Sequence, residues 1–135
     1  MLKYTIIVLA IFGMSLIKAL PEEMRELTGK LHSICVTKTG VSEDLITDAI
    51  NGDFSADEKF KCYLKCIMAE AGCFSEDGLM DVERSIGVFS ENIRAKVEVV
   101  IRKCAKENTS YNGCEAAWIL HKCCYEADPS IGFVF

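Results

Sequence analysis

Hydrophobic residues recur along most of the chain at steps of three and four, the spacing of an amphipathic helix. Met24, Leu27, Leu31 and Ile34 follow these steps after Pro21, at a position that favours a helix start. A sustained alternation of period two, typical of a half-buried strand, is absent from the sequence. The pattern therefore predicts an all-α fold of about six short helices.

Residues that favour helix ends separate the six predicted helices. The first begins after Pro21 and ends near Gly40, and Pro129 stops the last. The other predicted boundaries are Ser42 before residues 43–50, a capping box at residues 55–58 before a helix to about residue 71, Asp81 before a short helix that includes Val82 and Ile86, Ser90 before a helix that reaches Cys104, and Asn112 before residues 113–126.

The N-terminal residues form a different pattern. Lys3 precedes an apolar run from Tyr4 to Ile17, and the small Ala19 follows Lys18. This run is too short to span a bilayer, but it matches the apolar region of a secretory signal peptide. We expect residues 1–19 to be removed and residues 20–135 to form one secreted domain.

The charge balance restricts the partners. The chain has 15 Lys and Arg against 20 Asp and Glu, a net charge of -5, and loss of Lys3 and Lys18 makes it -7. Nucleic acid is excluded because no basic stripe is present to meet a phosphate backbone. Binding to an anionic membrane surface is disfavoured for the same reason.

All eight cysteines lie after residue 19, and an even set in a secreted chain predicts disulfides. Eight cysteines allow 105 pairings, so spacing alone does not choose among them. Cys62 and Cys66 share one face of a helix, whereas Cys114 and Cys123 lie on opposite sides of the last helix. The last helix should therefore be central, with a neighbour bonded on each side.

Catalytic and metal-binding signals are weak. The sequence lacks GxSxG, HExxH and a Gly-rich phosphate loop, and bonded cysteines supply no thiolate nucleophile. A calcium-dependent phospholipase is disfavoured because Ala127 stands where its histidine is needed and the Gly-rich calcium loop is missing. Zinc at His121, Cys123 and Cys124 is disfavoured because no paired CxxC accompanies them. We expect neither catalysis, a cofactor nor a metal.

Six of the cysteines have the gaps C-x26-C-x3-C-x37-C-x9-C-x8-C, from Cys35 to Cys123. This spacing resembles the six-cysteine signature of insect odorant-binding and pheromone-binding proteins, and the x3 and x8 gaps are its specific part. The similarity extends to members with a medium-length C-terminal tail, through the stretches 31–35, 38–41, 57–59, 61–63, 120–123 and 128–129. Plant lipid-transfer proteins also have eight cysteines, but their central CC pair and C-x-C are absent here.

The resemblance implies the disulfides Cys35–Cys66, Cys62–Cys114 and Cys104–Cys123. Cys73 and Cys124 lie outside the six-cysteine pattern. We expect them to form a fourth bond, because two free thiols are unusual in a secreted protein, and such a bond would add about 2 to 4 kcal/mol of stability.

The resemblance also implies an apolar cavity enclosed by the helices. His121 would make a polar contact with the ligand, and Phe133 in the tail would fold over it. A latch for the tail would involve His32, Tyr63, Asp128 and Phe135, and acid would weaken the latch by protonating the terminal carboxylate or Asp128. The other expected lining residues are Leu27, Leu31, Met68, Leu79, Met80, Phe89, Ile93, Val97 and Trp118.

The function implied is a soluble carrier, secreted into the sensillar lymph, that takes small hydrophobic odorants or pheromones to olfactory receptors and releases them in acid. Two alternatives stay open: a carrier of other small lipids or hormones in a non-sensory fluid, and a disulfide-stabilised interaction module. The partners would be a volatile or lipid ligand and an olfactory receptor, and the protein would be a monomer or homodimer. Residues 108–110 form a glycosylation triplet that we expect to be unused.

Overall fold

The computed structural model describes residues 22–75, 77–108 and 110–131, with side chains from residue 26 onward. The chain divides into two units between Lys30 and Leu31. Helix α2 (Glu22–Thr39) spans this boundary. In the first unit Lys30 pairs with Glu26 at 3.4 Å, one turn earlier, and Leu27 is 53% exposed. Leu27 is exposed in this unit, and its contact with a ligand stays a prediction.

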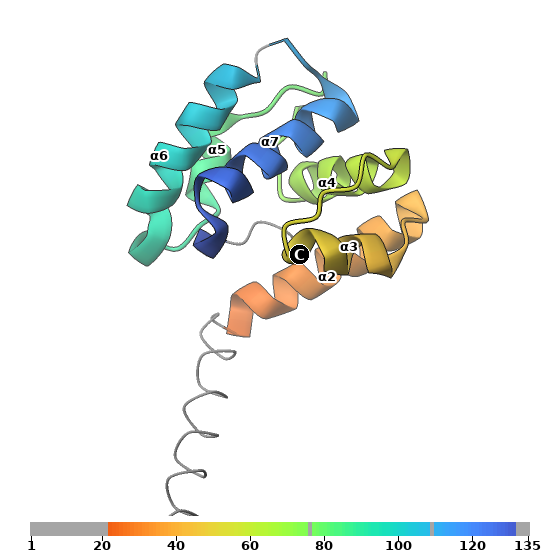
Figure 1. The fold of residues 1–135 in the computed structure, drawn as a ribbon. Coiled ribbons are helices and arrows are strands. Elements are labelled where there is room, and N and C mark those ends of the chain that lie inside the picture. The colour runs from red at the N-terminus through yellow and green to blue at the C-terminus, as the bar shows by residue number, and fades with distance from the viewer. Residues whose placement is uncertain (1–21, 76, 109, 132–135) are drawn as a thin grey trace, which may run out of the picture. The chain divides into compact units, whose positions relative to one another are not determined.

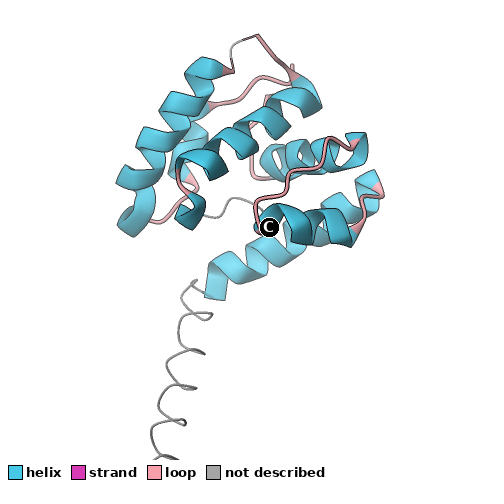
Figure 2. Cartoon of the chain, viewed as in Figure 1, coloured by secondary structure: helices cyan, strands magenta, loops and turns pink. Residues whose placement is uncertain are grey.

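The second unit is built from helices joined by short loops (Figures 1 and 2). Phe74 and Met80 form an isolated antiparallel bridge, and the described residues contain no longer strand. This confirms the all-α prediction. After α2 the elements are α3 (Glu43–Ile50), α4 (Glu58–Glu70), α5 (Val82–Gly87), α6 (Glu91–Glu107), α7 (Gly113–Ala127) and the 3-10 turn η1 (Pro129–Ile131).

The helix ends follow the predicted caps, with one change. Asp81 accepts a hydrogen bond from the backbone N–H of Arg84 at 3.0 Å, as expected for an N-cap. At α4 the cap is Asp57, which accepts from the N–H of Phe60 at 3.0 Å. Ser55 instead accepts from the N–H of Asp57 at 3.2 Å, so it orders the turn before the helix. The predicted capping box is therefore wrong.

Helix α7 packs against both α4 and α6 (Figure 1). One disulfide, Cys62–Cys114, joins the start of α7 to α4, and another, Cys104–Cys123, joins its end to α6. The third, Cys35–Cys66, joins α2 to α4. These are the three pairs that the family resemblance implies, and α7 has the central position that the opposite-sides argument predicted.

The interior is one continuous cluster of apolar side chains. Phe60 and Tyr63 of α4 are fully buried and stack with ring centroids 6.5 Å apart. Val97 of α6 and Ala117 of α7 are also fully buried, so the central helix meets close-packed side chains from its neighbours. This cluster fixes the faces of α4, α6 and α7 that turn inward.

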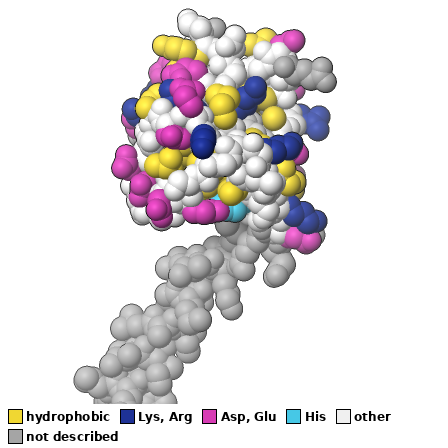
Figure 3. Space-filling view, turned by 90° about the vertical axis from the view of Figure 1, so that its right-hand side faces the viewer, with side chains coloured by type: hydrophobic (Ala, Val, Ile, Leu, Met, Phe, Trp, Pro, Cys, Tyr) yellow, Lys and Arg dark blue, Asp and Glu magenta, His cyan; other side chains and the backbone are white. Residues whose placement is uncertain are grey.

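Charged side chains of both signs are interspersed with small hydrophobic patches on the face seen in Figure 3. The described helices include none with the length and apolar character needed to cross a bilayer.

Asn108, the first residue of the glycosylation triplet, forms part of the end of α6. Its side-chain amide donates to the carbonyl of Ala116 in α7 at 2.8 Å, and its Oδ1 is completely enclosed. A glycan on this amide would separate the two helix ends, so we expect the folded protein to be unglycosylated. Protein secreted from insect cells should keep its mass on treatment with peptide N-glycosidase, and a loss of mass by one glycan would contradict this.

Candidate functional site

One polar side chain lies on the inner face of α7. The buried residues of this helix are Ala116, Ala117, Leu120, His121 and Cys124, which form a stripe at helical spacing. His121 is 5% exposed, and its Nδ1 donates to the carbonyl of Ala117 at 2.7 Å. Burial disfavours the charged ring and lowers the pKa of His121 to about 4, although the bond to Ala117 acts in the opposite direction. His121 is therefore neutral at pH 7.

Several of the expected lining residues share this interior. Leu31 of α2, Met68 of α4 and Val97 of α6 are buried in the same cluster as Leu120. Phe89, between α5 and α6, is also buried, and Met80 is half-buried against the cluster. Segments far apart in the sequence thus contribute to one apolar region around the inner face of α7. Methionine suits such a region because its flexible thioether adapts to different shapes.

Two other expected lining residues are at the surface. Leu79 is 58% exposed, because it adjoins Met80 in the antiparallel bridge with Phe74, and neighbouring side chains of an extended segment point to opposite sides. Ile93 is 37% exposed, because it lies in the first turn of α6, outside the buried part of the helix that begins at Val97. Both side chains are therefore exposed rather than part of the apolar cluster, and their contact with a ligand stays a prediction.

Trp118 has a different environment from the expected one. The ammonium groups of Lys61 and Lys122 lie 4.6 and 5.2 Å from its ring centroid, in cation–π geometry. Lys61 in turn pairs with Glu115 at 2.7 Å. The indole is thus half-buried beneath charged groups of α4 and α7 and also packs against the apolar cluster. Its contact with a ligand stays a prediction. This cluster was not predicted, although the implied Cys62–Cys114 bond places Lys61 and Glu115 next to each other.

The expected latch residues His32 and Tyr63 do come together. His32 Nδ1 lies 2.9 Å from the Tyr63 hydroxyl, and Nε2 lies 2.9 Å from a carboxylate oxygen of Glu43. The carboxylate accepts from Nε2, so the Tyr63 hydroxyl donates to Nδ1. Burial and the nearby Glu43 raise the pKa of Tyr63. The tail residues Phe133 and Phe135, predicted to cover the ligand and complete the latch, lie outside the described residues.

Asp128 is held by a separate set of contacts. Its carboxylate accepts hydrogen bonds from Ser130 and lies 3.2 Å from Lys96 of α6. The bond from Ser130, followed by the interaction with Lys96, lowers the pKa of Asp128 below its usual value. The carboxylate therefore stays charged at pH 5, so Asp128 is not the acid-sensitive group that the sequence analysis suggested.

The expected fourth disulfide is absent. Cys73 and Cys124 are both buried and both free. Cys73 follows α4 and lies beside the start of α5, where its carbonyl accepts from the N–H of Asp81 at 2.7 Å, whereas Cys124 belongs to the inner stripe of α7. Burial raises the pKa of both thiols, that of Cys124 to about 12. The thiols are therefore unreactive, and the structure has three disulfides.

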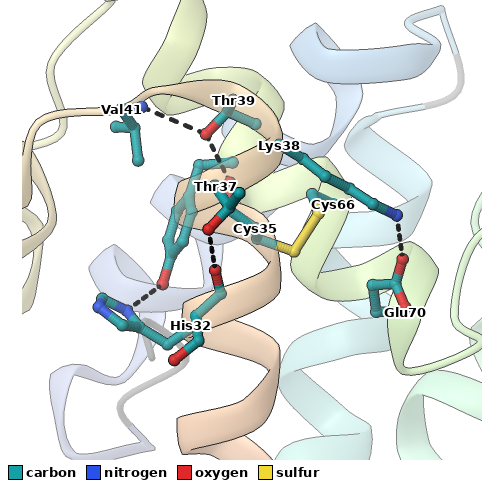
Figure 4. The surroundings of a disulfide bond; sticks show 10 residues. His32, Cys35, Thr37, Lys38, Thr39, Val41, Cys66 and Glu70 are labelled. Atoms are coloured by element: carbon teal, nitrogen blue, oxygen red, sulfur yellow. Dashed lines mark hydrogen bonds and ion pairs between the residues drawn. A yellow bond between two sulfur atoms is a disulfide. The ribbon is translucent and has the colours of Figure 1, made fainter.

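A surface cleft of about 300 Å³ lies on the outside of α4, next to two of the disulfides. Lys38 and Glu70 form an ion pair at 2.7 Å beside it (Figure 4). Its lining residues are Lys38, Cys62, Lys65, Cys66, Ala69, Glu70 and Cys114. This charged surface feature is distinct from the apolar interior around His121.

Residues 17–127 match the model of the PBP/GOBP family, which covers most of the chain. The chain belongs to this family. Its members are non-enzymatic, secreted proteins that carry small hydrophobic ligands, and the three disulfides of this chain fit that fold. The prediction that the chain is not an enzyme is confirmed by this membership.

The chain is also similar to individual insect proteins. The B1 protein of Tenebrio molitor is 28% identical over 120 residues, which cover 84% of this chain and 88% of that protein. A crystal structure of an odorant-binding protein from Locusta migratoria is similar with a TM-score of 0.72 and 30% identity, over 78% of this chain and 82% of that one. Odorant-binding protein 7 of Anopheles gambiae, solved with four disulfide bridges and an azo compound, shares the fold with a TM-score of 0.73 and 22% identity, over 83% and 91% of the two chains.

Proposed function

We propose that this PBP/GOBP protein carries small hydrophobic odorants or pheromones through the sensillar lymph to olfactory receptors, after removal of residues 1–19. The observation that carries the proposal is the match of residues 17–127 to a family of hydrophobic-ligand carriers. The apolar cluster around α7 supports it, because it contains the flexible Met68, and the buried His121 lies on the same helix face as its members Ala117 and Leu120. A ligand that buries about 250 Å² of apolar surface there would gain roughly 6 kcal/mol before ordering costs, so micromolar affinity is expected.

We further propose that the C-terminal tail closes over the bound ligand and that acid loosens this closure. The paired His32 and Tyr63 support the proposal, because they offer a polar anchor next to the apolar cluster. Asp128 is excluded as the trigger, since its carboxylate stays charged at pH 5. The pH-sensitive contact would then belong to the segment after Asp128.

Displacement of a fluorescent apolar probe tests both proposals. The oxidised domain, residues 20–135, should bind the probe and release it to volatile alcohols, esters or aldehydes at micromolar concentration at pH 7, and more weakly at pH 5. Removal of residues 130–135 should abolish the pH dependence. The carrier proposal fails if the probe does not bind although the three disulfides are intact, and the tail proposal fails if the truncated protein keeps the same pH dependence.

A further inference from the structure

The three disulfides differ in how deeply their two halves are buried. Cys35 and Cys104, which each form one half of the other two bonds, are completely buried in the apolar cluster. Both halves of the Cys62–Cys114 bond are only half-buried, and both line the cleft of about 300 Å³ on the outside of α4. Cys62–Cys114 is therefore the disulfide of the described chain that has both of its cysteines beside the cleft.

A completely buried half protects a disulfide from thiols. Exchange begins when a thiolate attacks one sulfur and the other sulfur leaves as a thiolate. A thiolate does not reach a buried sulfur, so Cys35 and Cys104 would have to be the leaving groups of their bonds. Burial raises the pKa of such a thiol, as it raises that of the buried Cys124 to about 12, and a thiol of high pKa leaves slowly. Cys62 or Cys114 would leave beside the open cleft instead.

The charges around the cleft favour an anionic thiol. Lys38 pairs with Glu70 at 2.7 Å, beside Cys66 (Figure 4). Lys65 also lines the cleft, and it forms no ion pair with any described residue. The two lysines and one glutamate of the lining give the cleft a net charge of +1, on a chain whose net charge is -5. A nearby ammonium group attracts the attacking thiolate and stabilises the leaving one.

The Cys104–Cys123 bond has the opposite charge in contact with it. Its half-buried sulfur, Sγ of Cys123, lies 3.5 Å from a carboxylate oxygen of Glu107. A carboxylate at this distance repels an approaching thiolate. This bond is therefore protected at both halves, by the burial of Cys104 and by the charge of Glu107.

We propose that Cys62–Cys114 is a thiol-exchange site, at which a small anionic thiol enters the cleft and opens this bond before the other two. In the first step the sulfur of the small thiolate bonds to one of the two cysteines, and the electron pair of the broken S–S bond stays on the other cysteine as a thiolate. A second small thiolate then attacks the mixed disulfide, which releases the second protein thiolate and the disulfide of the small thiol. The protein pair gains two electrons and takes up protons from water.

Opening this bond releases one end of the central helix. Cys114 is the second residue of α7, and its bond to α4 is the covalent link at that end. The ion pair between Lys61 and Glu115, next to the bond, still joins the start of α7 to α4. The Cys104–Cys123 bond still joins the far end of α7 to α6. A thiol in the cleft therefore loosens the start of α7 and leaves the rest of the domain cross-linked.

The order in which glutathione opens the three bonds tests the proposal. Samples of the oxidised protein are taken at intervals, quenched with N-ethylmaleimide in denaturant and analysed by peptide mass spectrometry. Cys73 and Cys124 are free from the start and serve as the labelling reference. Cys62 and Cys114, as free thiols or as mixed disulfides with glutathione, should appear about tenfold faster than the cysteines of the other two bonds. Earlier opening of another bond, or opening of all three at one rate, would overturn the proposal.

K65Q and K103Q separate the effect of the cleft from that of the overall charge. Each removes one positive charge, but Lys65 lines the cleft, whereas Lys103 is exposed on α6 outside it. K65Q should slow the opening of Cys62–Cys114 by glutathione about threefold, and K103Q should leave the rate unchanged. Cysteamine, whose thiolate form has no net charge, should open the bond at nearly the same rate in all three proteins. A glutathione rate that K65Q does not lower would contradict the selection of an anionic thiol by the cleft.

Discussion

Replacement of Cys62 and Cys114 together by serine should lower the free energy of unfolding by about 4 kcal/mol. The bond closes a segment with a sequence separation of 52 residues, so its loss returns a large conformational freedom to the unfolded chain. It also fixes the start of α7 to α4, next to the Lys61–Glu115 pair. Urea unfolding of the oxidised protein, followed by circular dichroism, measures the change.

Two further double variants serve as controls. Loss of Cys104–Cys123, with a sequence separation of 19 residues, should cost about 3 kcal/mol, less than the longer link. Replacement of the free Cys73 and Cys124 by alanine should cost only about 1 kcal/mol, because no loop is opened. A loss near 4 kcal/mol from that last pair, together with a titration that finds no free thiol in the unfolded, unmodified protein, would show that Cys73 and Cys124 are bonded to each other.

Acidification from pH 7 to pH 5 should lower the free energy of unfolding by roughly 2 kcal/mol through His121 alone. The pKa of His121 is about 4 in the folded protein and near 6.5 in the unfolded chain, so the unfolded state binds more protons between these values. The contribution of His121 to the free energy of unfolding is therefore fully present above pH 6.5 and falls as the pH drops towards 4. Urea unfolding at half-unit pH steps measures the slope.

Substitution of each histidine in turn shows which of the two rings produces the pH dependence of the free energy of unfolding. H121F should give a flatter stability profile between pH 6.5 and pH 4, because the substituted ring does not titrate. H32N changes the other histidine, which lies near the surface and pairs with Glu43, and it should keep the steep part that His121 produces. If H121F retains the full slope, the pKa of His121 is not lowered by burial and the slope comes from other groups.

Helix positions followed closely from local sequence signals. Ser42, Ser90 and Asn112 precede α3, α6 and α7 as predicted, although none of their side chains forms a cap hydrogen bond. The backbone preference of these residues for extended geometry was therefore enough to mark the boundaries. Asp57, and not Ser55, caps α4. Both residue types suit an N-cap, and which of them caps the helix depends on the path of the chain through the preceding loop.

The interior was less predictable, because burial of a residue depends on its neighbours in space. Trp118 and His121 both lie on α7 at positions predicted to face the interior, yet His121 is buried and Trp118 only half-buried. The lysines that contact Trp118 come from two helices, and no local pattern pairs them with the indole. The exposure of Leu79 was unpredictable for a similar reason, since the direction of its side chain follows from the bridge between Phe74 and Met80.

The central claim is that ligands bind in the apolar interior beside α7. Intermolecular nuclear Overhauser effects between a protonated aliphatic alcohol and the methyl groups of the deuterated, methyl-labelled domain test it most directly. We expect contacts to Met68, Val97 and Leu120, which are buried, and none to Leu79 or Val99, which are 58% and 71% exposed. Contacts confined to the exposed pair would mean that the ligand binds at the surface, and would contradict the account.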